Sequence, residues 1–178
     1  NILVLLFWVL TFNLSASGSP EFSTAGFYEL PNTGREVYSM NLAWRFIKGD
    51  VSGTPYAADF DDSGWEVVSL PHGLEYLPVE ASGCANYQGV AWYRKRFTPD
   101  DRLKGKQLFV HFEAIMGKSE VYVNGQLLKT HYGGYLPVIL DVTNLLKWDE
   151  ENVIAVKADN SDDPSYPVGK PQNLLDFT

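Results

Sequence analysis

Carboxylates are the residues of this sequence that could do acid–base chemistry, and they gather in three short acidic runs. These runs are Asp61-Asp62, Asp149-Glu150-Glu151 and Asp162-Asp163. A general acid and a general base must be held in a cleft beside the reacting group, with pKa values suited to the proton transfer. Each run lies instead beside Gly, Ser, Pro or Asn, which favour turns. We therefore predict solvated turn residues and no catalytic pair.

Histidine and cysteine offer no metal site. A zinc site needs three or four closely placed ligands, whereas His72, His111 and His131 stand apart, with no spaced partners. We expect His72 to be a structural residue. Cys84 is the single cysteine, which excludes an internal disulfide, and we expect it to be a small buried hydrophobe. We predict no metal and no cofactor.

The net charge and the aromatic content of the chain indicate which kinds of molecule it could bind. The chain has 14 Lys+Arg against 22 Asp+Glu, a net charge of -8, which argues against nucleic acid because phosphate binding needs a basic face. Aromatic residues make up 14% of the sequence, as suits a β protein or a carbohydrate-binding surface. Tyrosines in expected loops could stack on sugar rings, although for each of them we favour the alternative that it packs against another part of the protein. They are Tyr76, Tyr87, Tyr132, Tyr135 and Tyr166.

The first residues differ in character from the rest. Residues 2–10 form an uninterrupted apolar run, and Ser15-Ala16-Ser17 follows shortly after it. This pattern is typical of a signal peptide, and the run is shorter than the roughly 20 residues that a spanning helix needs. We predict a partial signal peptide at 1–17, an irregular leader at 18–40, and a periplasmic or secreted protein without membrane association. The alternative is a buried strand or helix that opens the domain.

From residue 41 onward the pattern is that of β-strands separated by turns. Residues 90–97 alternate, so that Trp92, Arg94 and Arg96 share one face and Tyr93 the other. Asn124-Gly125 between two such runs is a strong hairpin signal. The expected strands are 44–47, 65–70, 90–97, 107–112, 119–123, the run after Gly125, 138–142 and 152–158.

The absence of crossover helices excludes a parallel α/β fold and favours an antiparallel sandwich or barrel. The one modest helical piece, at 141–146, is expected to be a one-turn connection. We expect Trp44, Trp65 and Trp92 to contribute to the core, where each large aromatic would contribute about 2–3 kcal/mol.

Four strings in this order resemble the N-terminal sugar-binding domain of glycoside hydrolase family 2, the family of β-galactosidases, β-glucuronidases and β-mannosidases. They are FDDSGW running on to LPH at 60–72, GVAWYRKRF at 89–97, the stretch 105–125 ending in VYVNG, and DVTNLL followed by ENVIAV at 141–156. The resemblance covers residues 41–178. It implies an all-β fold, an antiparallel jelly-roll (galactose-binding-like) β-sandwich.

The resemblance also implies sugar contacts. Asp176, within Leu175-Asp176-Phe177, matches an aspartate that reaches a neighbouring active site and accepts a hydrogen bond from a sugar hydroxyl; the alternative is that it caps a turn. A second contact is usually an Asn after the LPH string. Glu75 stands at that place here, and Asn86 is the nearby alternative.

The last residues resemble the start of the family's DFxxxxGIxR segment, so we expect the final strand of the domain to begin where this sequence stops. By the resemblance, the two catalytic carboxylates lie on a (β/α)8 barrel further along. The chain is thus interpreted as an N-terminal fragment without a catalytic residue, inactive by itself and prone to associate through an unpaired sheet edge.

The resulting functional hypothesis is an accessory domain of an exported, retaining family 2 enzyme, most like a bacterial β-galactosidase, that acts on terminal β-glycosides. Its partners would be a carbohydrate and the catalytic barrel. The whole enzyme could be a monomer or a homo-oligomer, and the sequence does not decide between the two. The alternatives are a stand-alone, non-catalytic carbohydrate-binding module, or a purely structural adhesion domain.

Overall fold

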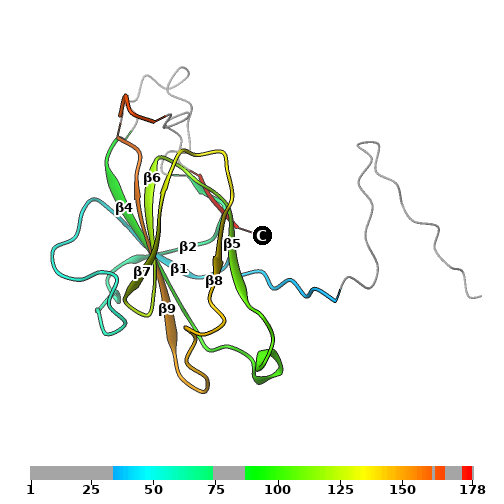
Figure 1. The fold of residues 1–178 in the computed structure, drawn as a ribbon. Helices are drawn as coiled ribbons and strands as arrows, with labels where there is room; N and C mark the ends of the chain where they lie inside the picture. The colour runs from blue at the N-terminus through cyan, green and yellow to red at the C-terminus, as the bar shows by residue number, and fades with distance from the viewer. Residues whose placement is uncertain (1–33, 74–86, 162, 167–173, 178) are drawn as a thin grey trace, which may run out of the picture. The chain divides into compact units, whose positions relative to one another are not determined.

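A computed structural model describes residues 34–73, 87–161, 163–166 and 174–177, the last four through their backbone alone. The chain divides into two units, residues 1–36 and 37–178. The described part of the second unit is an antiparallel β-sandwich, with a six-stranded sheet facing a four-stranded one (Figure 1).

The six-stranded sheet has the order β2-β1-β4-β9-β6-β7, and the four-stranded sheet has the order β3-β10-β5-β8. A short 3-10 helix, η1 (Asp101–Leu103), follows β4. The strands are β1 (Trp44–Lys48), β2 (Glu66–Val68), β3 (His72–Gly73), β4 (Val90–Phe97), β5 (Phe109–Ile115), β6 (Lys118–Val123), β7 (Gln126–Tyr132), β8 (Val138–Asp141), β9 (Asn152–Asp159) and β10 (Leu174–Phe177).

The predicted sandwich and its eight expected strands are confirmed, with small shifts of their ends. The connection after β8 is one hydrogen-bonded turn, in which Leu145 N donates to Val142 O at 3.0 Å, and no helix forms there. The expectation for the final strand is wrong. Residues 174–177 already form β10, which pairs on one side with β3 and on the other with β5.

The hairpin between β6 and β7 has the two-residue turn that the sequence predicts. Asn124 has φ 50° and Gly125 has φ 86°, the positive values that a type I′ turn requires. The Asn124 side chain donates to Leu145 O at 2.9 Å and to Asn152 Oδ1 at 2.8 Å. The asparagine therefore holds the loop before β9 against the hairpin as well as supplying the turn.

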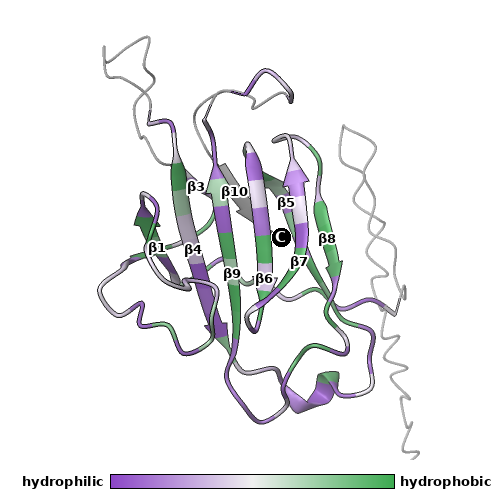
Figure 2. Cartoon of the chain, turned by 60° about the vertical axis from the view of Figure 1, so that its left-hand side comes forward, coloured by the Kyte–Doolittle hydropathy of each residue, from purple (hydrophilic) through white to green (hydrophobic). Residues whose placement is uncertain are grey.

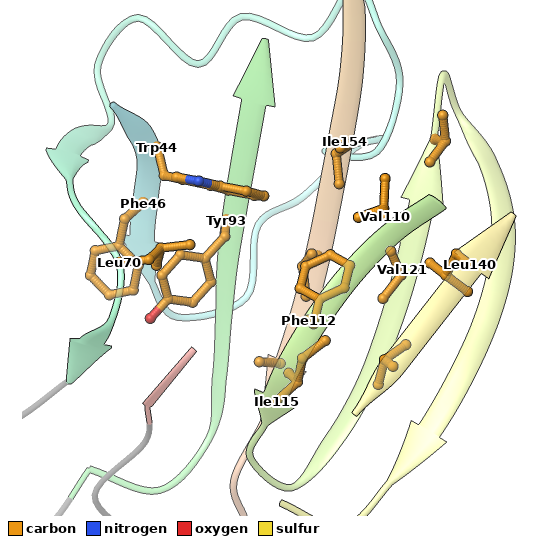
Figure 3. Packing of buried hydrophobic residues seen from close by; sticks show 14 of the residues in the cluster. Trp44, Phe46, Leu70, Tyr93, Val110, Phe112, Ile115, Val121, Leu140 and Ile154 are labelled. Carbon is orange, nitrogen blue, oxygen red and sulfur yellow. The ribbon is translucent and has the colours of Figure 1, made fainter. Parts of the chain in front are cut away.

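The core lies between the two sheets and is built from alternate residues of the strands. Trp44 of β1, Tyr93 of β4, Ile154 of β9, and Phe112 and Ile115 of β5 belong to one buried cluster there (Figure 3). Trp44, Phe112, Ile115 and Ile154 are fully buried. The Trp44 indole also donates to Met40 O at 2.7 Å, which ties the residues before β1 to the core.

β4 is buried on both faces, which the amphipathic pattern alone does not predict. It begins hydrophobic and ends hydrophilic (Figure 2). Tyr93 faces the core, as expected, whereas Trp92 and Arg94 on the other face are buried as well. Trp92 Nε1 donates to Asp50 Oδ1 at 3.2 Å, so the segment between β1 and β2 supplies the partners for this outer face.

Arg94 is the centre of that outer packing. Its side chain is fully buried, and its Nε donates to Asp62 Oδ2 at 2.7 Å. The guanidinium also donates to the carbonyl oxygens of Pro55, of Ala57 at 3.0 Å and of Phe60 at 3.4 Å. A guanidinium carries five donors in a fixed fork, which suits it to gather several acceptors from one loop.

Arg96 extends the same network toward solvent. It donates to Phe60 O at 2.8 Å, lies 3.3 Å from Asp62, and forms an ion pair with Glu151 at 2.6 Å. Two arginines of β4 therefore fix the 55–62 segment against the sheet.

Arg94→Gln should strongly destabilise the domain, because it leaves Asp62 buried without its buried cationic partner. Removing one member of a buried pair costs about 3–5 kcal/mol, which urea unfolding of the purified chain would measure. Arg102→Gln is the matched control, since Arg102 and its partner Asp100 are both exposed and such pairs contribute little. Equal stability of the two variants would contradict this account of the network.

Candidate functional site

The backbone of Asp176 lies inside the four-stranded sheet. It stands opposite Ala114 of β5, while Leu175 stands opposite Ile115 on one side and His72 on the other. The register shifts after Asp176, because Phe177 pairs with Phe112, so that Glu113 is the extra residue of β5 at a bulge. A bulge of this kind re-aims the neighbouring side chains and is frequent beside functional sites.

His72 holds β3 next to β10. Its ring is buried, contacts the Phe46 ring edge-on at 4.6 Å, and has its Nδ1 2.9 Å from the Tyr93 hydroxyl. Burial lowers the pKa of His72 below the ordinary value of 6.5. His72 therefore has a structural role, as expected, although its partner is the Tyr93 side chain and not the backbone. Through β3 it holds the strand that pairs with β10.

The other two predicted sugar contacts, Glu75 and Asn86, lie outside the described residues, as does Cys84. The sheet does fix the start of the segment that carries them. Gly73 stands opposite Leu174, two residues before Asp176.

One prediction about the acidic runs is wrong. Asp62 is not a solvated turn residue; it is 5% exposed and paired with Arg94. Asp61 is exposed, as predicted, and its Oδ1 accepts from Ser63 N at 2.9 Å. Asp149 and Glu151 are exposed too, in ion pairs with Lys104 at 3.3 Å and Arg96 at 2.6 Å.

The loop tyrosines divide into structural and exposed ones. Tyr87 donates to Val90 O at 2.6 Å and packs against the core, so its role is structural. Tyr132 and Tyr135 are 53% and 68% exposed, and Tyr166 meets Tyr132 edge-on at 5.1 Å. Tyr132 pairs with Lys118 at the start of β6. Tyr76 lies outside the described residues.

The described ranges hold neither a cluster of metal ligands nor a membrane-spanning helix. Over these residues, no three His, Cys, Asp or Glu side chains come together in a way that could hold a metal ion. None of the helices in the same ranges has the length and apolar character needed to cross a membrane.

Comparison with known proteins identifies the sandwich. The family model described as "Glycosyl hydrolases family 2, sugar binding domain" matches residues 54–170. The chain belongs to this family. The match begins in the segment that Arg94 holds and includes β2 to β9, so it covers the whole network around Asp62.

Individual relatives agree with the family 2 assignment. The chain is 41% identical over 135 residues to a β-galactosidase of Thermoanaerobacter pseudethanolicus, covering 75% of this chain and 18% of that protein. It is 36% identical over 136 residues to a β-glucuronidase of Formosa agariphila, covering 71% of this chain and 14% of that one. The chain thus spans less than a fifth of the length of these relatives.

A solved family 2 structure has the same fold. The Bacteroides uniformis β-glucuronidase 2, in a form covalently bound to cyclophellitol-6-carboxylate aziridine, is 31% identical with a TM-score of 0.64. The similarity covers 70% of this chain and 15% of that one.

The sequence of this family 2 domain did not predict β3 or the bulge at Glu113. β3 pairs with the strand that carries Asp176, and the bulge follows directly after that residue. The LPH string was the available signal, because its His72 is the residue that pairs with β10.

Acidification should destabilise the domain through His72. A histidine whose pKa is lower in the folded state takes up a proton more readily when unfolded, so its contribution is complete above about 6.5 and is lost as the pH falls below that value. His131, whose pKa burial also lowers, adds to the slope. We expect His72→Gln to flatten the dependence of the unfolding free energy on pH between about 7 and 5, and an unchanged slope would refute the assignment.

Proposed function

We propose that this chain is the sugar-binding domain of an exported, retaining, β-galactosidase-like enzyme of family 2. The enzyme would hydrolyse terminal β-glycosides with carboxylates that lie outside this chain. The support is that the relatives named above are β-galactosidases and β-glucuronidases, of which this chain matches 14% to 18%. We call the longer protein to which this chain would belong the parent enzyme.

The observation that supports a binding role is that carboxylates of the acidic runs form ion pairs with arginine and lysine side chains. A retaining hydrolase needs two carboxyl groups about 5–5.5 Å apart across the glycosidic bond. Among the described residues, the acidic runs are engaged elsewhere: Asp62 with Arg94, Asp149 with Lys104 and Glu151 with Arg96. A carboxylate that neutralises a buried arginine is unsuited to proton transfer. Because these acidic residues are engaged in ion pairs, we favour a domain that helps to form the sugar-binding pocket, with the catalytic carboxylates in another part of the enzyme.

Asp176 is the residue that we propose for the sugar contact. Its backbone lies between two strands and beside a bulge, so the position is fixed by the sheet. A carboxylate there would accept hydrogen bonds from hydroxyls of the non-reducing sugar, and such charge-assisted bonds are about twice as strong as neutral ones. Glu75 or Asn86 would add a second contact from the segment that follows Gly73.

Export is proposed from the sequence of the first residues. The apolar run at 2–10, followed by small residues, supports a signal peptide and therefore a periplasmic or secreted enzyme.

The purified 178-residue chain should show no hydrolysis of a chromogenic β-galactoside above background, because the proposal assigns the acid and the nucleophile to sequence outside this chain. A longer product of the same gene that includes the proposed barrel is the positive control, and it should turn the substrate over. Turnover by the 178-residue chain would contradict the proposal.

Asp176→Asn in the parent enzyme should lower kcat/KM by about 10- to 100-fold, the loss expected for a hydrogen bond to a charged group. Steady-state kinetics would measure it, with Asp101→Asn in the exposed η1 as the matched control. The thermal unfolding temperature should stay close to that of the wild type. An Asp176→Asn enzyme as active as the control would remove Asp176 from the sugar site.

A further inference from the structure

An open cavity of about 510 Å³ lies where the loops before β5 and after β8 meet. Its walls come from Gly105–Gln107, from the Asp141–Asn144 turn, and from Trp148. The cavity is widely open to solvent and its lining is mainly polar, so it would hold a ligand along one side and would not enclose it.

The polar wall of this cavity is held in place before any ligand arrives. Asp141 Oδ1 accepts from Thr143 N at 2.9 Å, and Asp141 Oδ2 is 3.3 Å from Gln107 Nε2. Thr143 Oγ1 in turn accepts from Leu108 N at 2.9 Å. The hydrogen bonds from Thr143 and Gln107 lower the pKa of Asp141, so a carboxylate faces the cavity at neutral pH.

Trp148 supplies the apolar wall. Its ring is partly exposed, and Lys104 Nζ lies 5.8 Å from the ring centroid. Lys104 is itself held by ion pairs with Asp101 at 2.8 Å and Asp149 at 3.3 Å. The indole is thereby steadied beside the carboxylate and amide groups.

This combination selects for one class of ligand. A sugar ring has an apolar C–H face that fits an aromatic plane, and hydroxyls at its edge that a carboxylate and amides can bind. Lys106 and Asp141 give the lining one charge of each sign, which favours a neutral ligand. A lone carboxylate is too little for a hard cation such as Ca²⁺, which takes six to eight oxygen ligands.

The cavity is also well separated from Asp176. Asp141 stands opposite Phe109 at one end of β5, and Asp176 stands opposite Ala114 near the other end. Five residues of strand correspond to roughly 17 Å, so the two positions cannot contact the same sugar ring.

We propose that this cavity is a carbohydrate-binding site that takes a pyranose ring of a neutral oligosaccharide between Trp148 and the Asp141–Asn144 turn. The proposal does not rest on Asp176 or on the parent enzyme. It gives the sandwich an affinity for glycans of its own, with which it could hold an enzyme near a polymeric substrate.

The test is a titration of the full 178-residue chain with lactose and with cellobiose, followed by ¹H–¹⁵N NMR. We expect saturable shifts at Gly105–Gln107 and Asp141–Trp148, with a dissociation constant on the order of 1 mM for at least one of the two sugars. Trp148→Ala and Asp141→Asn should each weaken binding about 10-fold or more. Tyr135→Ala, an exposed aromatic outside the cavity, is the matched control and should bind like the wild type.

The proposal fails if neither sugar gives saturable shifts up to about 50 mM, if the shifts map elsewhere, or if folded Trp148→Ala binds as well as the control. Shift mapping on the wild-type chain decides the matter even if a variant does not fold. Binding that Asp176→Asn abolishes and Trp148→Ala spares would overturn this inference while supporting the proposed sugar contact at Asp176.

Discussion

The ion pair between Arg94 and Asp62 is the interaction on which the rest of this domain depends. It joins the middle of β4 to a segment more than thirty residues earlier in the chain, and both side chains are withdrawn from water. The desolvation cost of such a pair is offset only when further hydrogen bonds satisfy both groups. Here the backbone carbonyls of the 55–60 segment accept from the guanidinium, and Arg96 Nε donates to the Asp62 carboxylate, so the segment is shaped around the guanidinium.

This pair also explains why two of the sequence strings occur together. FDDSGW contributes Asp62, and WYRKRF contributes Arg94 and Arg96. The strings that mark a sugar-binding domain are therefore largely structural here. They cover and stiffen the six-stranded sheet, while the four-stranded sheet carries Asp176 in β10 and, at the end of β8, Asp141, which lines the Trp148 cavity. One sheet serves as the support and the other presents the positions that we propose to meet sugars.

Most of the fold could be predicted from the sequence because its long strands alternate with period two and its β6–β7 turn needs Asn-Gly. The burial of Asp62 could not, because an aspartate in DDSG has the local signature of an exposed turn and its partner is distant in sequence. β3 and β10 are two and four residues long, too short for a period to emerge. The bulge at Glu113 depends on pairing between distant strands, so local sequence gives no sign of it.

The most direct test of the central claim is a double-mutant cycle on the two residues of the pair. Unfolding free energies of the wild type, Arg94→Gln, Asp62→Asn and the double variant give the coupling between them. If the FDDSGW and WYRKRF strings are held together by this pair, the coupling free energy between Arg94 and Asp62 should be about 2 kcal/mol or more, near the top of the range for contacting residues. Effects that add to within about 0.5 kcal/mol would show that the two side chains act independently and would contradict the account.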